Sequence, residues 1–239
     1  MAEPENELLE LAPGQAFGFA CGPQVPCFNA CCRDLSQFLT PYDILRLKTS
    51  LNLASGEFLA RYTQGHTGPS TGLPVRTLAF SGPERECCFL TPRGCSVYED
   101  RPSSCRAYPL VRVASRNRAT GRVSERWFLL EEDHCQGFCQ AESHTPAQWA
   151  AGQGLLPYNR MNDRFMEVLA ARNRMAPGPL SKEREQEFIL ACNDLDRFQE
   201  ILARGELPDA GAPPPPAGDG TALLDFALDW IIRRFTSPA

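Results

Sequence analysis

The segment FACGPQVPCFNACCRD, residues 19–34, holds four of the chain's eleven cysteines. Cys27 and Cys31 are four positions apart, which fits the reach of a ligand pair at a turn, and Cys31 and Cys32 are adjacent. Thiolates are soft ligands that suit zinc and the iron of iron-sulfur clusters, and either metal takes four of them. The segment therefore predicts a metal site.

Further cysteines follow this segment at Cys87, Cys88, Cys95, Cys105, Cys135 and Cys139. Adjacent cysteines point their sulfurs in different directions, so Cys31 and Cys32 favour more than one metal atom. We therefore favour an iron-sulfur cluster over zinc, and both stay open. The competing interpretation is that these are buried apolar thiols, since free cysteine is often interior. For Cys192, which shares a predicted helix face with Phe188 and Leu195, core packing is the better interpretation.

The composition narrows the class of protein. The chain of 239 residues can bury a core without disulfides, and its net charge of −5, without a dense Lys/Arg tract, argues against nucleic-acid binding. The acidic N-terminus lacks the features of a secretory signal, and no apolar run approaches the roughly 18 residues of a membrane span. We expect a cytoplasmic protein without a membrane partner, whose thiols are kept reduced.

The chain is expected to have four parts and an α+β fold, with a loop-rich cysteine-cluster domain and packed C-terminal helices. They are a flexible acidic N-terminus at 1–16, a metal-binding domain with a helical extension at 17–205, a proline-rich linker at 206–220 and an amphipathic helix at 221–239. The linker contains Pro213 to Pro216, which favour extended polyproline structure. We expect the last helix to be mobile or docked as a lid, and to be a candidate surface for a protein partner.

Local signals predict several elements. Thr40-Pro41 and Thr145-Pro146 each suit the start of a helix, because threonine caps and proline fits the first helical position. Residues 111–115 and 123–130 predict a hairpin. The remaining predictions are an extended segment at 73–80 and helices at 57–62, 159–173, 181–204 and 223–235.

Cations and histidines near the cysteines have separate expected roles. Four thiolates around a divalent metal leave a net negative site, which nearby cations should offset. Arg33, Arg101 and Arg106 are the candidates, with a solvated surface position an equal alternative for Arg33. The histidines are weaker ligand candidates, although His134 lies beside Cys135.

Five segments together resemble the YkgJ-type cysteine-cluster proteins, a mainly bacterial family described as a zinc- or iron-chelating domain. They are FACGPQVPCFNACCRD at 19–34, LTPYDILRLK at 39–48, CCFLTPRGCSVYEDRPSSCRAYPL at 87–110, HCQGF at 134–138 and WAAGQGLLPYNRMN at 149–162. The resemblance runs from about residue 17 to 162, and residues 94–106 are its most specific part. It implies a bacterial metal-binding protein with eight ligands: Cys21, Cys27, Cys31, Cys32, Cys87, Cys95, Cys105 and Cys135.

Two departures from the family pattern bear on this ligand set. The short form of the motif has two residues between its first cysteines, whereas five follow Cys21 and three follow Cys27 here. This departure leaves the ligands near Cys21 open. Cys88 stands where the family usually has proline, so we do not expect it to be a shared ligand. Cys139 is left without an assignment.

Three functions compete at this point. The first is a metal-binding module without catalysis, in which metal binding stabilises the folded loops. The second is an enzyme, because the resemblance extends to flagellin lysine N-methylases, and a similarity to those implies an iron-sulfur cluster. No glycine-rich loop after a strand recommends the S-adenosylmethionine site that a methylase needs. The third is a thiol redox sensor, which requires exposed thiols of low pKa. We rank them in this order.

Overall fold

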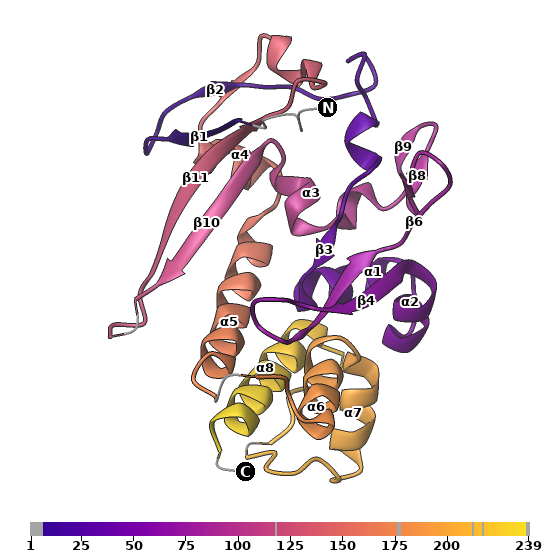
Figure 1. Cartoon of the computed structure of the whole chain (residues 1–239), viewed down its shortest axis with the longest axis vertical. Helices are drawn as coiled ribbons and strands as arrows, with labels where there is room; N and C mark the ends of the chain where they lie inside the picture. The colour runs from indigo at the N-terminus through magenta and orange to yellow at the C-terminus, as the bar shows by residue number, and fades with distance from the viewer. Residues whose placement is uncertain (1–6, 118, 176–177, 212, 217, 238–239) are drawn as a thin grey trace. The chain divides into compact units, whose positions relative to one another are not determined.

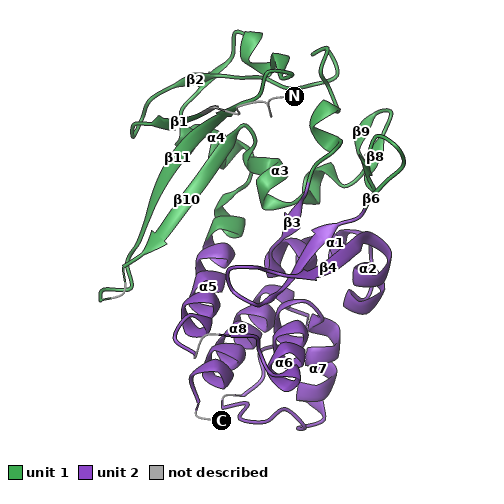
Figure 2. Cartoon of the chain, in the orientation of Figure 1, with its two compact units in different colours: residues 1–35, 80–159 green, residues 36–79, 160–239 purple. Residues whose placement is uncertain are grey.

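The computed structural model describes residues 7–117, 119–175, 178–211, 213–216 and 218–237. Two compact units divide the chain, and each is built from two separate stretches (Figure 2). Unit 1 contains residues 1–35 and 80–159, and unit 2 contains residues 36–79 and 160–239. Helices and small antiparallel sheets occur together, so the predicted α+β class is confirmed.

Unit 1 contains a three-stranded antiparallel sheet in the order β1-β11-β10 (Figure 1). The predicted hairpin is confirmed as β10 (Leu110–Arg116) and β11 (Val123–Glu131), with Val111 opposite Phe128. Strand β1 (Glu7–Leu11) pairs with the other edge of β11. We expected residues 1–16 to be flexible, but here their backbone groups at 7–11 are hydrogen-bonded in a sheet and Leu11 is buried.

Short elements make up the rest of unit 1, as a loop-rich cysteine domain requires. They are β2 (Phe17–Gly18) paired with β12 (Ser143–His144), β6 (Phe80–Ser81) with β7 (Glu86–Cys87), β8 (Leu90–Thr91) with β9 (Gly94–Cys95), the 3-10 helices η1 (Ala30–Cys32), η2 (Tyr98–Asp100) and η3 (Gln136–Cys139), and the helices α3 (Ser103–Ala107) and α4 (Pro146–Gly152).

An aromatic core holds these loops in place. Phe19 is 1% exposed, and its ring lies 5.5 Å from that of Trp149 on α4 and 5.8 Å from that of Tyr108. The Trp149 indole N–H donates to the carbonyl oxygen of Ala107 at 2.9 Å, which ties α4 to α3. Thr145 starts α4 as predicted, and it forms a capping box with Gln148. The core thus fixes the helix α3 that carries Cys105.

Unit 2 begins with a small sheet and two helices. Its elements here are β3 (Phe38–Leu39), α1 (Pro41–Ser50), α2 (Ser55–Tyr62), β4 (Thr63–Thr67) and β5 (Pro74–Leu78), with sheet order β3-β5-β4. The predicted start of α1 is confirmed, because the Thr40 hydroxyl accepts from the Asp43 N–H at 3.3 Å and the Asp43 carboxylate accepts from the Thr40 N–H at 2.9 Å. The two bonds satisfy backbone donors that the helix leaves free.

In the described residues after Leu155, the helices are α5 (Leu156–Arg172), α6 (Lys182–Cys192), α7 (Leu195–Ala203) and α8 (Gly220–Thr236). The unit boundary falls within α5, between Asn159 and Arg160. The prediction of a single helix at 181–204 was wrong. Helix α6 ends at Cys192, and a separate helix, α7, begins at Leu195. Asp194 causes the restart, since its carboxylate accepts from the Arg197 N–H and caps α7.

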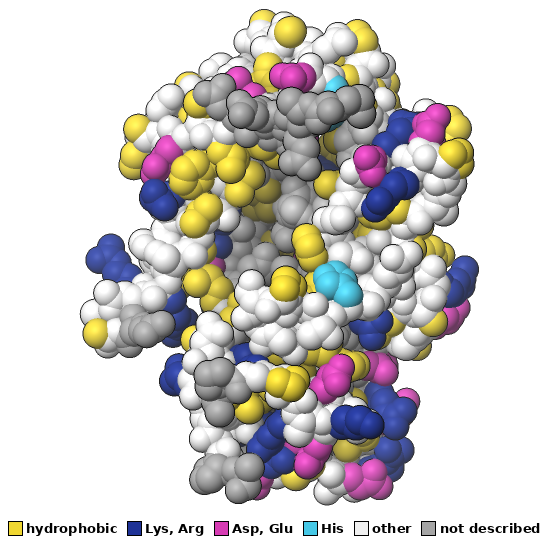
Figure 3. Space-filling view, in the orientation of Figure 1, with side chains coloured by type: hydrophobic (Ala, Val, Ile, Leu, Met, Phe, Trp, Pro, Cys, Tyr) yellow, Lys and Arg dark blue, Asp and Glu magenta, His cyan; other side chains and the backbone are white. Residues whose placement is uncertain are grey.

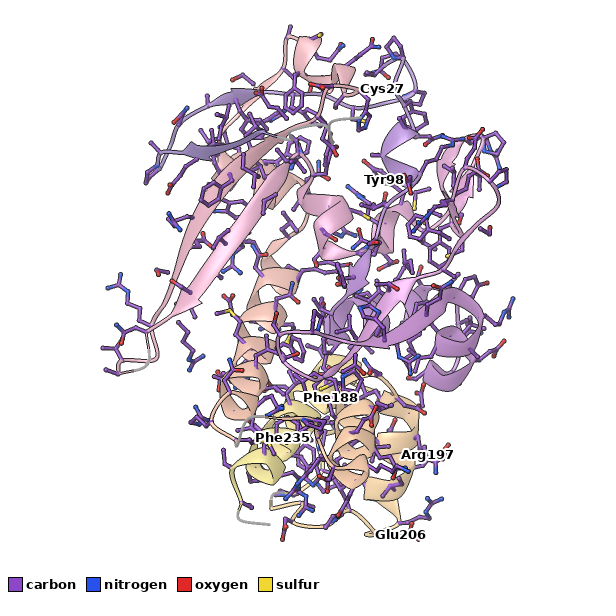
Figure 4. All side chains as sticks on the ribbon, in the orientation of Figure 1. Cys27, Tyr98, Phe188, Arg197, Glu206 and Phe235 are labelled. Carbon is purple, nitrogen blue, oxygen red and sulfur yellow. The ribbon has the colours of Figure 1, made fainter. Side chains whose placement is uncertain are left out.

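Helix α8 packs against the other helices of unit 2. Trp230 is 1% exposed, and the Phe188 and Phe235 rings are stacked with centroids 6.4 Å apart (Figure 4). The Trp230 indole N–H donates to the Pro208 carbonyl at 2.7 Å, so the described start of the proline-rich segment is tied to α8. The apolar side of α8 is therefore buried within unit 2.

The outer surface of the helices in unit 2 carries charges of both signs, which alternate on the face shown in Figure 3. Several form ion pairs, among them Arg234 with Glu187 at 2.7 Å and Arg164 with Asp225 at 2.7 Å. Within the described part of the chain, no helix has the length and apolar content needed to cross a membrane.

Candidate metal centre

Unit 1 contains ten of the eleven cysteines, and Cys192 lies in unit 2. All eleven are free thiols. The ten lie in turns and in short elements, not in long helices or strands. They are Cys21 and Cys27 in the first loop, Cys31 and Cys32 in η1, Cys87 in β7, Cys88 after it, Cys95 in β9, Cys105 in α3, Cys135 before η3 and Cys139 at its end.

The first loop and the η3 region bring three predicted ligands together. Cys27 accepts a hydrogen bond from the Gln136 backbone N–H at 3.1 Å, and it is also hydrogen-bonded to Cys135. Burial raises the pKa of Cys21 to about 11, and the charges of Cys31, Cys27 and Cys135 add to this rise. Cys21, which the family spacing left open, therefore lies among the other candidates. Cys27 is labelled in Figure 4.

The adjacent pair in η1 connects this group to the others. Cys32 is hydrogen-bonded to Cys31 and lowers the pKa of Cys31 to about 7. The same hydrogen bond, followed by burial, raises the pKa of Cys32. The charges of Cys87 and Cys105 also raise it, so both thiols are near this pair.

A second hydrogen-bonded pair occurs at the end of β7. Cys88 lowers the pKa of Cys87 to about 7 through a side-chain hydrogen bond. Burial raises the pKa of Cys95, and the charges of Cys87 and Cys31 act on it in the same direction. The electrostatic contacts therefore link all eight predicted ligands in one continuous group, with Cys88 attached through Cys87.

Proximity is not yet a coordination geometry. Among the described residues, no group of three or more Cys, His, Asp or Glu side chains has the arrangement that a metal ion needs. The structure thus brings the eight thiols into one neighbourhood without directing any four of them at one point. The ligand set remains a prediction.

Two of the three candidate arginines are buried in this neighbourhood. Arg101 is 8% exposed, donates to the Tyr98 carbonyl at 2.5 Å and to the Gln153 side-chain oxygen, and lies 3.7 Å from the centroid of the Tyr98 ring. Arg106 is also 8% exposed and donates to backbone carbonyls, including that of Gln153 at 2.7 Å. Its other acceptors are the carbonyls of Arg101 and Glu99.

Arg33 differs from this pair. Its guanidinium forms ion pairs with Glu84 at 3.0 Å and with Glu86 at 2.9 Å, and 37% of its side chain is exposed. The surface position that we considered for Arg33 is therefore what the structure shows. Its charge is already balanced by two carboxylates.

Sequence reasoning missed two residues, one beside a thiol and one that binds the two buried arginines. The pKa of Tyr108 is raised by burial and by the neighbouring Cys135. Gln153 binds Arg101 through its side chain and Arg106 through its backbone carbonyl. Tyr108 stood two positions after Arg106 and could have been noticed, but nothing local distinguishes Gln153.

The histidines contribute little to this neighbourhood. His134 lies 3.9 Å from Glu132 and is half exposed. His144 is packed between aromatic rings, 5.1 Å from Trp149 between centroids, and His66 belongs to unit 2. The donor set of the site is accordingly dominated by sulfur, which zinc and iron-sulfur iron prefer.

Fold and site together define an α+β protein in which short loops gather a cysteine cluster of the metal-binding type. Residues 20–142 match the model of the CxxCxxCC family, described as a "putative zinc- or iron-chelating domain". The match covers more than half of the chain and includes all ten clustered cysteines, so the chain belongs to this family. Comparisons with curated proteins and with solved structures found no match. Zinc or iron binding is the property that the family assigns.

Proposed function

We propose that this protein binds a metal centre through the eight thiolates Cys21, Cys27, Cys31, Cys32, Cys87, Cys95, Cys105 and Cys135. One observation supports the proposal above all. These thiols come from four separate stretches of sequence, at residues 21–32, 87–95, 105 and 135, yet electrostatic contacts connect them in one group within unit 1. Buried thiols that only filled a core would not need to be near one another.

An iron-sulfur cluster is our preferred centre within this proposal. The sulfurs of Cys31 and Cys32 are hydrogen-bonded to each other, and Cys87 and Cys105 are close to the same pair. A single tetrahedral zinc uses four ligands, whereas eight thiols in one group suit a polynuclear centre or more than one metal atom. When bound, the metal would supply folding energy to loops that have little regular structure.

The compartment, a protein partner and the alternative functions stay proposals. A reducing, cytoplasmic compartment fits a thiolate centre, because oxidation would convert the ligands to disulfides. A protein partner at α8 would have to use its polar outer side, since its apolar side is buried in unit 2. The lowered pKa of the exposed Cys31 meets one requirement of a redox sensor, which stays the alternative to metal binding. No observation in the described structure favours an enzyme.

Anaerobic purification tests the proposal directly. The metal-loaded protein is analysed for iron, zinc and acid-labile sulfide, and its visible absorption spectrum is recorded. Iron with sulfide and visible charge-transfer bands would support the iron-sulfur centre, and stoichiometric zinc without colour would support zinc binding. A protein that is fully folded, colourless and free of metal would refute metal binding.

A further inference from the structure

We propose that Arg101 is the positioning residue that balances the negative charge of the thiolate centre. The inference rests on the proposed metal site and deepens it, because it specifies the charge of the centre that unit 1 accepts. The inference follows from two features of Arg101 among the described residues: its hydrogen-bond partners are neutral, and no carboxylate forms an ion pair with it.

Arg101 is a buried cation whose hydrogen-bond partners are neutral. One end of its guanidinium donates to the Tyr98 carbonyl, the other donates to the amide oxygen of Gln153, and the flat face covers the Tyr98 ring. Within the described residues, no carboxylate forms an ion pair with Arg101. Burying an unpaired charge is costly, so a cation that is 8% exposed should have an anionic counterpart.

Thiolates held by a metal would supply that counterpart. Burial raises the pKa of Cys21, and the charge of Arg101 acts against this rise. Burial lowers the pKa of Arg101, and the charges of Cys105 and Cys95 are among those that act against this fall. These three cysteines come from the first loop, from β9 and from α3, so the guanidinium is near several candidate ligands at once. Four thiolates on one divalent metal carry a net charge of about −2, and a cation in the adjacent shell stabilises it.

The acceptor Gln153 holds Arg101 through a neutral group, so it leaves the charge of the guanidinium unpaired. A glutamate at this position would have the same shape and would form an ion pair with Arg101, but it would neutralise the guanidinium. The neutral amide holds Arg101 in place while leaving its full charge for the thiolates. Replacing Gln153 by glutamate therefore keeps the hydrogen bond to Arg101 and changes only the charge beside the guanidinium.

The experiment measures zinc affinity of the reduced, metal-free full chain by competition with a chelator. The variants are Arg101→Met, Arg101→Lys and Gln153→Glu, with Arg33→Met as the control because Arg33 is already paired with carboxylates. Arg101→Met and Gln153→Glu should each weaken zinc binding about 10- to 100-fold, the usual effect of losing a partner in the shell around the ligands. Arg101→Lys, which keeps the charge, should lose less, and Arg33→Met should bind as the wild type does.

Gln153→Glu distinguishes charge balance from a structural role. If Arg101 only holds Tyr98 and Gln153 together, the new ion pair keeps or improves that contact, and zinc affinity stays equal or rises. That result, or equal affinity in Arg101→Met and Arg33→Met, would overturn the inference while leaving the metal site intact. Should Arg101→Met fail to fold, Gln153→Glu and Arg101→Lys still decide the question. Absence of zinc and iron binding by the wild type would refute the proposed function itself.

Discussion

Replacing cysteines one at a time by serine should separate metal ligands from packed thiols. Cys32 and Cys192 form an informative pair, because each is the last residue of a helical element but only Cys32 lies among other thiols. Serine places a hard, protonated oxygen where a metal needs a thiolate. Cys32→Ser should therefore lose metal, and the folding of unit 1 should weaken with it.

Cys192→Ser should keep the metal. The thiol is 3% exposed on α6, and burial alone accounts for its raised pKa. A hydroxyl at this apolar position should cost about 1 to 3 kcal/mol of unfolding free energy unless it finds a partner. Because the residue belongs to unit 2, the loss should leave the metal content of unit 1 unchanged.

The assay is metal per protein, measured under anaerobic conditions, together with unfolding in denaturant. The variants to compare with Cys192→Ser are the serine replacements of Cys27, Cys31, Cys32, Cys87, Cys95, Cys105 and Cys135. Cys88→Ser should keep the metal, since a hydroxyl can still donate to Cys87. Retention of metal in all seven would mean that these are packed or redox thiols, and loss of metal in Cys192→Ser would show that unit 2 supplies a ligand.

Three further predictions concern unit 2. Thr40→Ala should lower the unfolding free energy by about 1 kcal/mol, because the cap of α1 is lost; unchanged stability in chemical denaturation would contradict the capping role. Trp230→Ala should cost about 3 to 5 kcal/mol without altering metal content, and metal loss in a folded variant would show that α8 supports the site. Although burial acts to raise the pKa of Asp196, hydrogen bonds from Lys48 and Ser55 hold it below its ordinary 3.8. This stabilisation is complete above pH 3.8 and is lost as the pH falls through the lower folded pKa, so Asp196→Asn should flatten the acid limb of a stability curve; an unaltered limb would exclude this contribution.

Local sequence signals predicted the elements whose causes are local. The starts of α1 and α4 depend on a threonine, a proline and the residue three positions after the cap, and both capping boxes form. The β10–β11 hairpin likewise depends on a short connection between two runs of strand-forming residues. These interactions are complete within a few residues, so periodicity and spacing are enough to reveal them.

Other features depend on partners far along the chain. Strand β1 needs the edge of β11, and Glu10 forms an ion pair with Arg126 of that strand at 3.2 Å. An acidic N-terminal segment gives no sign of such a partner. The two units are interleaved for the same reason, since contacts between distant stretches define them. The sequence could identify the cysteines as candidate ligands and Arg101 as one of three candidate cations. It could not show that Arg33 is paired with two carboxylates whereas Arg101, among the described residues, is paired with none.

The surroundings of the candidate site extend beyond the family match at residues 20–142. Arg106, next to Cys105, is bound by the Gln153 carbonyl, and Trp149 holds the carbonyl of Ala107 in the same helix. The ring of Tyr158 lies 4.8 Å from the Arg106 guanidinium. Cys105 is therefore positioned by α4 and the residues just after it, which contain no cysteine. Because buried cations and aromatic rings fix this helix, the structural requirement for the metal site should extend to about residue 158 even though the candidate ligands end earlier.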